Sequence, residues 1–546
     1  MPLHDYKLWS CLILLQNRFC FLPVIHFLKG EISASSNKLN MNRYIFLGKI
    51  VSPYIKQNSA DAVLTENNKI ISVGSRKDIL PLIDSNTEVI DMEGKTILPG
   101  LIDAHNHFTM MGMLAFQLDL NHILDRSQIL KMIRHEHLIL PSGQPLIGTA
   151  YEIEKFSPEQ RLTSDDLEKV APGRLIQISD RCGHMSVTDE YTLQATGIPY
   201  EDPTPACPGL PKKFSGILCG RTNSRLYHYF QQMVQSEKNL KLAWKWASDT
   251  AVQHGVTHIH ALITEEDLPS LLAYKECLPI DLRIYAETKK IDLAKEYGLS
   301  QIGGCGRVMV DGDTGPETAA FLDPYLDHPE TKGCLYWNDE EIKSYYIKAA
   351  ENGMQVILHC IGDAASSQVM DAVENARKIH PNQIRNRIEH FEFGDDALKD
   401  RVKKMGLCLS MQPNFNYLWP HDEYDEMLGE KRALEADPIH SLLSRSIPVG
   451  FGSDCPVTPC NPLLTIYSAV NHSNPKERIS PEQALFCHTM GSAYLGCEEN
   501  IRGSITPGKL ADLTIMEEDP ELVSPNSIKD ISVDMTVSRG KIVYSR

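Results

Sequence analysis

The segment Ile97–Phe108 reads Ile-Leu-Pro-Gly-Leu-Ile-Asp-Ala-His-Asn-His-Phe, and it organises the interpretation of the whole chain. Two histidines, His105 and His107, stand at the end of its apolar run with one residue between them. In an extended strand, residues i and i+2 point to the same face, so both imidazoles can reach one metal ion. Imidazole suits zinc and similar metals, and two nitrogens supply half of a tetrahedral ligand set. Taken alone, however, the pair is more typical of a strand with two hydrogen-bonded polar residues.

Three further polar residues stand where predicted strands end. His359 and His390 end two such strands, and Asp454 follows a third. The strands are expected over residues 354–360, 387–391 and 448–452. In a barrel of parallel strands the C-terminal ends all face one mouth, so these side chains would meet the two histidines of the first segment. A single histidine is more often structural, but five candidates at strand ends favour a metal site.

The pattern of helices and strands predicts an α/β protein with two parts. Short strands recur over residues 44–98 and 513–544, so the two chain ends are expected to form one composite β-sandwich. Between them, repeated βα units favour a closed (β/α)₈ barrel of the kind found in metal-dependent hydrolases. An open, doubly wound sheet is the alternative, and no glycine-rich phosphate-binding loop supports it. The expected domains are an N-terminal extension (1–40), the composite β-sandwich (41–98 with 503–546) and the barrel (99–502, with an excursion at about 110–200).

The composition excludes several classes of partner. The chain has 546 residues, which is too long for a single hydrophobic core. Its net charge of −17 argues against nucleic acid and against an anionic membrane surface. The 14 cysteines include no Cys-x-x-Cys pair, which favours reduced thiols in the cytoplasm and argues against a disulfide framework or a thiolate zinc site. The expected partner is a small-molecule substrate, and a homo-oligomer stays open.

The first forty residues differ from the rest of the chain. They contain two apolar patches, and neither reaches the roughly 20 residues that a membrane-spanning helix needs. Asp5 does not suit the cationic start of a signal peptide. Met41 is followed at once by a well-formed strand pattern. We therefore expect residues 1–40 to be a disordered extension or to precede the true start of translation at Met41.

Five motifs together resemble the amidohydrolase superfamily. They are Pro99–His107, Leu358–Asp363, Arg387–His390, Gly452–Asp454 and Gly503–Leu513. The resemblance is strongest to the amidohydrolase family 3 branch, which includes N-substituted formamide deformylase. It implies a metal-bearing barrel with a composite β-sandwich, in agreement with the pattern of helices and strands.

The resemblance also implies roles for individual residues. The implied metal ligands are His105, His107, His359, His390 and Asp454. Asp454 resembles the carboxylate that contacts the metal, takes a proton from water and later returns it to the leaving group, which makes it the catalytic residue. His184 and Asp363 are expected to orient the substrate, although a structural role for each is about equally plausible.

One position departs from the superfamily pattern. Many relatives carry a lysine on the strand before the Asp-Gly that corresponds to Asp311-Gly312, and in several branches its carbamate bridges two metals. The motif's register places Arg307 at that position, and a guanidinium stays protonated and forms no carbamate. We therefore expect one divalent metal per chain, with zinc first and iron, manganese or cobalt as alternatives. Asp311, Asp313 or a cysteine could supply a bridging anion if a second metal binds.

The expected reaction is hydrolysis of a carbon–nitrogen bond in an amide, N-formyl compound or cyclic amide by hydroxide formed at the metal. Deamination is the nearest alternative, but superfamily deaminases generally carry a glutamate three residues after the histidine equivalent to His359, where this chain has Gly362. An esterase remains a further alternative. A non-catalytic metal-binding relative is another, but the retained Asp454 argues against it.

Overall fold

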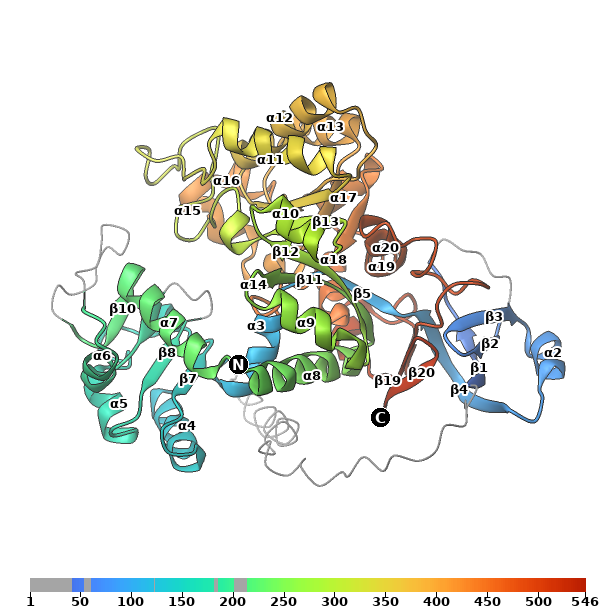
Figure 1. Ribbon diagram of the computed structural model, residues 1–546, viewed down its shortest axis with the longest axis horizontal. Helices are drawn as coiled ribbons and strands as arrows, with labels where there is room; N and C mark the ends of the chain where they lie inside the picture. The colour runs from blue at the N-terminus through green and yellow to red at the C-terminus, as the bar shows by residue number, and fades with distance from the viewer. Residues whose placement is uncertain (1–41, 54–59, 122, 181–184, 201–213) are drawn as a thin grey trace, which may run out of the picture. The chain divides into compact units, whose positions relative to one another are not determined.

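The computed structural model describes residues 42–53, 60–121, 123–180, 185–200 and 214–546 (Figure 1). Within these ranges the strands form sheets of seven, five and eight members. The predicted N-terminal extension and His184 lie outside the described residues.

The eight-stranded sheet is the (β/α)₈ barrel. Its strand order is β17-β16-β15-β14-β13-β12-β11-β5, and neighbouring strands pair in parallel. An isolated parallel bridge joins Asn106, at the end of β5, to Cys455, just after β17, and so brings the two edges of the sheet together. The predicted barrel is thus confirmed, and the open sheet is wrong. The strands are β5 (Leu101–Asn106), β11 (Val256–Thr264), β12 (Asp281–Glu287), β13 (Gln301–Gly304), β14 (Gln355–Cys360), β15 (Arg387–His390), β16 (Cys408–Met411) and β17 (Val449–Phe451).

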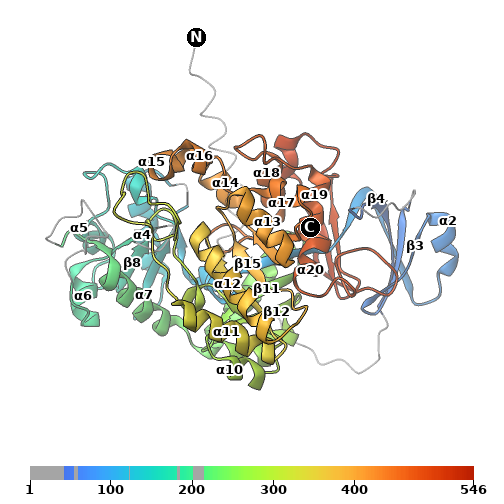
Figure 2. The ribbon, with the colours of Figure 1, turned by 90° about the horizontal axis from the view of Figure 1, so that it is seen from above.

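Amphipathic helices cover the outside of the barrel strands (Figure 2). Each presents an apolar face to the sheet, because only that face can be buried against the strands. The helix α11, for example, begins with a capping box between Asn338 and Glu341 and buries Ile342 and Tyr346. The covering helices include α8 (Glu237–Gln253), α10 (Ile291–Glu296), α11 (Asp339–Glu351), α12 (Asp363–Ile379), α13 (Asp396–Met405) and α18 (Pro462–Val470).

The two ends of the chain form one composite sheet, as predicted. Its strand order is β20-β19-β18-β4-β1-β2-β3, and β4 pairs in parallel with β1 and antiparallel with β18. Side chains from both chain ends share a core that includes Phe46, Ile97 and Ile515. The strands are β1 (Arg43–Ile50), β2 (Ala62–Glu66), β3 (Lys69–Gly74), β4 (Thr87–Pro99), β18 (Leu513–Met516), β19 (Val533–Ser538) and β20 (Lys541–Ser545). The domain boundaries drawn from the sequence stay a prediction.

Gly100 joins the composite sheet to the barrel. The strand β4 ends at Pro99 and β5 begins at Leu101. A Cβ atom on Gly100 would lie 2.3 Å from the Thr257 hydroxyl oxygen and 2.9 Å from Asp512 Cβ, so only glycine fits this crossing. The chain therefore passes directly from a strand of one sheet to a strand of the other.

The stretch predicted as an excursion contains its own small sheet and core. The strand order is β10-β9-β8-β7-β6, and Ile129, Leu146 and Ile178 are among the residues packed in its core. The strands are only two to four residues long: β6 (Leu118–Asp119), β7 (Leu146–Thr149), β8 (Ile176–Ser179), β9 (Met185–Val187) and β10 (Ile217–Cys219). The helices α4 (Arg126–Ile139), α5 (Ser164–Val170), α6 (Glu190–Thr196) and α7 (Gly220–Val234) belong to the same stretch of chain.

The described helices and cysteines bear on the expectations about a membrane and about reduced thiols. None of the described helices combines the length and apolar character that a membrane crossing requires. Nine described cysteines are free thiols, but Cys219 is disulfide-bonded, which corrects the expectation of reduced thiols alone.

Candidate metal centre

The structure brings the five predicted ligands together at the C-terminal ends of the barrel strands. His105 lies near the end of β5 and His107 follows it, while His359 and His390 lie at the ends of β14 and β15. Asp454 follows β17. Its Oδ1 lies 3.1 Å from His105 Nε2 and 3.2 Å from His107 Nε2. The ring centroids of His390 lie 4.8 Å from those of His105 and 4.5 Å from those of His359.

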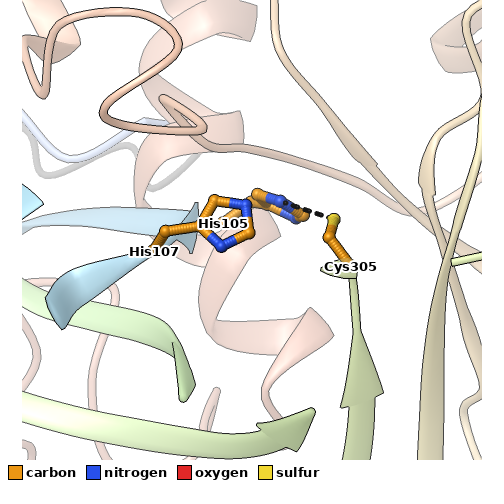
Figure 3. Close-up of side chains that lie close together, drawn as sticks. All are labelled: His105, His107 and Cys305. Carbon is orange, nitrogen blue, oxygen red and sulfur yellow. Dashed lines mark hydrogen bonds between the residues drawn. The ribbon is translucent and has the colours of Figure 1, made fainter. Parts of the chain in front are cut away.

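Cys305, which directly follows β13, lies among these histidines, although the sequence did not single it out. Figure 3 shows it beside His105 and His107. Its Sγ lies 3.5 Å from His105 Nε2, 3.6 Å from His359 Nδ1 and 3.6 Å from His390 Nε2. Around a tetrahedral zinc ion, with Zn–S near 2.3 Å and Zn–N near 2.0 Å, a sulfur and a nitrogen ligand lie about 3.5 Å apart. The spacing is therefore that of atoms that share an ion.

Arg307 does not enter the centre, so its predicted place is wrong. Its side chain is 62% exposed, and its Nη2 lies 2.8 Å from Glu266 Oε1. The strand β13 ends at Gly304, and a 3₁₀ turn over Gly306–Val308 follows. The residue that faces the barrel mouth is thus Cys305, two positions earlier than the motif's register indicates. The missing Cys-x-x-Cys pair argued against a thiolate zinc site, but Cys305 is the cysteine that lies where a bridging anion was left open.

The donor atoms form three overlapping groups in which all atoms lie within 4.8 Å of one another. The groups are His105 with His107 and Cys305, Cys305 with His359 and His390, and His105 with His390 and Asp454. Two of the three groups share Cys305. This donor set suits zinc and related divalent metals, and it is large enough for either one ion or two.

Outer hydrogen bonds determine which nitrogen of each ring faces the cluster. His105 Nδ1 donates to Glu389 Oε2 at 2.5 Å, His390 Nδ1 to Gln412 Oε1 at 2.8 Å, and His359 Nε2 to the backbone oxygen of Gly312 at 3.2 Å. These oxygens only accept, so the outer nitrogen of each ring carries a proton and the other nitrogen faces the cluster, where it would offer a lone pair to a metal. Metal-binding histidines are held in this way. Glu389 lies within the motif Arg387–His390, but the sequence alone indicated no role for it.

The charges of the cluster fit a cation. Burial alone would lower the pKa of His105, but the charges of Cys305 and Asp454 raise it well above its ordinary value. His107 is affected in the same way, with its pKa raised to about 10. Burial alone would raise the pKa of Asp454, but the two rings hold it well below its ordinary range. The buried Oδ1 of Asp454 makes no hydrogen bond, which suits an oxygen that faces a metal.

Asp103 positions Asp454 through hydrogen bonds to the preceding residue, Ser453. Its carboxylate accepts hydrogen bonds from the Ser453 backbone nitrogen at 2.9 Å and from the Ser453 hydroxyl at 2.6 Å. The Asp454 nitrogen donates to the His105 backbone oxygen at 2.8 Å. Asp454 itself has a left-handed φ of 55°, a conformation that needs such support. The strand β5 and the residue directly after it thus carry two of the predicted ligands, and Asp103 in the same strand positions a third.

Glu287, the last residue of β12, also lies next to the predicted ligands, and the sequence did not indicate it. Its Oε1 accepts the Cys305 backbone N–H at 3.0 Å and lies 3.9 Å from His107 Nδ1. Burial raises the pKa of Glu287, although the charge of His107 opposes that shift.

Two of the residues considered for substrate or metal binding, Asp363 and Asp311, accept hydrogen bonds from the backbone. Asp363 Oδ1 accepts a hydrogen bond from the Leu322 backbone nitrogen at 2.8 Å, and its substrate-binding role stays a prediction. Asp311 is fully buried and accepts hydrogen bonds from three backbone nitrogens, those of Ala320, Ile361 and Gly362. It therefore shapes the neighbouring loops, as its exclusion from the ligand set implied. His184 lies outside the described residues.

A family model, two named proteins and a solved structure are similar to this chain over most of its length. The family model described as "Amidohydrolase family" matches residues 88–544. The chain is 29% identical over 520 residues to YtcJ of Bacillus subtilis (strain 168), whose name calls it an amidohydrolase, with 89% of this chain and 96% of that protein covered. It is 22% identical over 533 residues to the N-substituted formamide deformylase of Arthrobacter pascens, with 90% and 96% covered. A solved structure of an uncharacterized metal-dependent hydrolase from Pyrococcus furiosus has the same fold, with a TM-score of 0.74, 24% identity, and 89% of this chain and 100% of that chain covered.

Proposed function

The chain belongs to the amidohydrolase family and is a metal-dependent hydrolase, and from this premise we propose that it cleaves a carbon–nitrogen bond other than a peptide bond. The substrate class is an amide, an N-formyl compound or a cyclic amide. The observation that carries the proposal is the convergence of inward-facing lone pairs on one point at the barrel mouth, with a carboxylate beside them. The proposed ligands are His105, His107, His359, His390, Asp454 and Cys305.

The roles follow from the chemistry of the donor set. A bound divalent cation lowers the pKa of water from about 15.7 to about 7 and polarises a carbonyl group. Asp454 lies at the edge of the cluster with an oxygen free of hydrogen bonds, so it is the group that takes a proton from water and delivers it to the leaving nitrogen. His105 and His107 hold that carboxylate at 3.1 and 3.2 Å. Zinc is the expected metal, and iron, manganese or cobalt would suit the same ligands.

The position of Cys305 bears on the number of metals. The expectation of one ion rested on Arg307, which lies outside the centre. Cys305 belongs to a ligand group on each side of the cluster, and its thiol pKa is held well below the ordinary value because the nearby histidines outweigh burial. If two cations are held here, the Cys305 thiolate would supply the anionic charge that offsets their repulsion. We therefore propose two ions that share Cys305 in place of one.

Two observations narrow the reaction. The formamide deformylase relative is named for action on N-substituted formamides, which supports N-formyl compounds as the first substrates to test. Deamination is disfavoured because the position three residues after His359 has no room for an acid: a Cβ atom on Gly362 would lie 1.9 Å from the Ala320 backbone oxygen. A small-molecule substrate in the cytoplasm, without nucleic acid or membrane, remains part of the proposal.

A substrate screen tests the proposed function. Protein stripped of metal and reloaded with zinc, cobalt or manganese is incubated with N-formyl amines, acyl amides and hydantoin-like rings. We expect metal-dependent release of the amine or of the opened ring, and the Asp454→Asn variant should lack it. Turnover of esters or phosphoesters alone, or release of ammonia from an aminated ring, would contradict the proposal.

A further inference from the structure

We propose that Glu389 and Arg387 are a charged positioning pair that fixes the orientation of His105 and strengthens it as a metal ligand. The inference rests on the proposed metal centre, and it concerns residues behind the ligands.

The pair holds His105 at two points. Glu389 Oε2 accepts the His105 Nδ1 proton at 2.5 Å, and Arg387 donates to Glu389 through Nε at 2.8 Å and Nη2 at 2.7 Å. The same Nη2 donates to the backbone oxygen of Ala104 at 2.9 Å. Arg387 therefore supports both the partner of the His105 ring and the peptide that precedes it. All three side chains are fully buried, so water does not weaken these interactions.

The far side of Arg387 is anchored deeper in the barrel. Its Nη1 donates to His260 Nδ1 at 2.8 Å, and its guanidinium carbon lies 5.1 Å from the centre of the Tyr285 ring. A guanidinium only donates, so His260 Nδ1 must accept and the ring carries its proton on Nε2. This excludes Nε2 as a metal ligand, although it lies close to donor atoms of His258 and Glu498. His260 therefore anchors Arg387 through Nδ1.

The outer partner of His105 differs in charge from those of the neighbouring ligands. His390 donates to the neutral amide of Gln412, and His359 donates to a backbone carbonyl. His105 alone among these three rings donates to a carboxylate. Arg387 donates two hydrogen bonds to the two oxygens of Glu389, which is the geometry of a guanidinium paired with a carboxylate. A carboxylate behind a histidine makes the facing nitrogen more basic than a neutral acceptor does.

Stability alone does not explain a pair of this kind. A buried ion pair loses about as much hydration free energy as it gains from attraction, and well-packed apolar residues of similar volume often match or exceed its stability. The barrel interior is normally filled by branched apolar side chains. A charged pair in that place, in contact with a ligand, therefore indicates a role at the metal centre.

The test separates the charge of Glu389 from its hydrogen bond. Glu389→Gln keeps an acceptor for His105 but leaves the Arg387 charge unpaired, so it can lose stability. The double variant Arg387→Gln/Glu389→Gln removes both charges together. We expect zinc and cobalt to bind each folded variant about 10- to 100-fold more weakly than wild type, in competition with a coloured chelator. The absorption bands of the cobalt-loaded protein should shift as well.

The matched control is Arg502→Gln/Asp512→Asn. It removes another buried ion pair, in which Arg502 Nη1 lies 3.2 Å from Asp512 Oδ2, away from the proposed ligands. It should bind metal like wild type. Wild-type affinity and cobalt spectrum in a folded Glu389 variant would overturn the inference. Should neither variant fold, Glu389→Asp keeps the ion pair and shortens its reach to His105, and unchanged affinity there overturns the inference equally. If the wild-type protein itself binds no divalent cation, the proposed function fails with it.

Discussion

The mouth and the base of the barrel both bury charged side chains, but they use them differently. At the mouth, the Oδ1 of Asp454 is buried without a hydrogen bond among inward-facing histidine nitrogens. At the base, opposite charges face one another: Arg502 lies 2.7 Å from Asp281, and His258 lies 2.6 Å from Glu498. A carboxylate and a thiol that face several histidine nitrogens at one point form a donor set for a cation. Charges that are matched to one another indicate a structural joint.

The base connects the barrel to the composite sheet. Asp512, immediately before β18, lies 3.2 Å from Arg502 and accepts a hydrogen bond from the Arg539 backbone nitrogen at 2.8 Å. Its backbone oxygen accepts the N–H of Gly100 at 2.8 Å. The charges of the base therefore join the last strands of the chain to the first strand of the barrel.

Removal of residues 503–546 tests the base most severely. The deletion removes β18, β19 and β20, exposes the edge of β4 and leaves Arg502 without Asp512. Each remaining half of the composite sheet has too few strands to bury its apolar face. We expect no soluble folded protein, measured by size-exclusion chromatography after expression. A soluble, active barrel without these residues would show that the base is not a joint.

Asp454→Asn tests the mouth. The amide cannot take or return a proton, so kcat should fall by about 10² to 10⁴, the usual contribution of a general acid or base. The fold and most of the metal content should be kept, since the remaining ligands are unchanged. Kinetics on the substrate found by screening, with metal content determined in parallel, give the answer. Wild-type turnover would remove Asp454 from the mechanism.

Cys305→Ala tests whether the thiolate bridges two ions. Without that anion two cations would repel each other, so elemental analysis should find one metal per chain where wild type has two. The matched control is Cys408→Ala, because burial raises the pKa of Cys408 to about 12 and its thiol stays protonated. That control should keep the wild-type metal content. Full wild-type activity at one equivalent of metal would restore the single-ion arrangement.

Glu498→Gln tests the base of the barrel through the pH dependence of the free energy of unfolding. Burial alone would raise the pKa of Glu498, but His258 and Arg502 lower it from 4.5 to about 2. Because the folded pKa is lower, the ionised carboxylate stabilises the fold above pH 4.5 by about 3 kcal/mol, and this contribution is lost as the pH falls towards 2. Urea unfolding should therefore find the variant less stable than wild type at pH 7 and equally stable near pH 2. Metal content should not change, and a loss of metal would contradict the separation of mouth and base.

The strands that could be predicted from the sequence share one property. The strands that carry His105, His359 and His390 are apolar runs that end in a ligand type, so the strand and the ligand are recognised together. The composite sheet was predicted because short strands recur at both ends of the chain. These patterns are local, and closure of the barrel then brings the ligands together through space.

Cys305 was missed because its strand lacks such a pattern. The strand β13 is four residues long and ends in two glycines, so neither alternation nor an apolar run identifies it. The expected position of the strand residue was inferred from its distance in sequence to Asp311. A 3₁₀ turn that contains Arg307 lies between β13 and Asp311, so the inferred position was two residues too far along the chain. The small sheet over β6–β10 escaped for a similar reason, because its strands are too short to show a period. Glu389 could not be assigned, since its partner His105 is 284 residues away.

The pairing of β4 with β18 also has a consequence for the order of events during synthesis. Ile97 is paired with Ile515, so 418 residues (515 minus 97) must be added after β4 before its partner strand exists. At about 5 to 20 residues per second, a ribosome needs roughly 20 to 80 s for that length. Throughout this interval the strand that leads through Gly100 to His105 has one open edge. The strand that leads into the barrel therefore completes its pairing in the composite sheet only after β18 has left the ribosome.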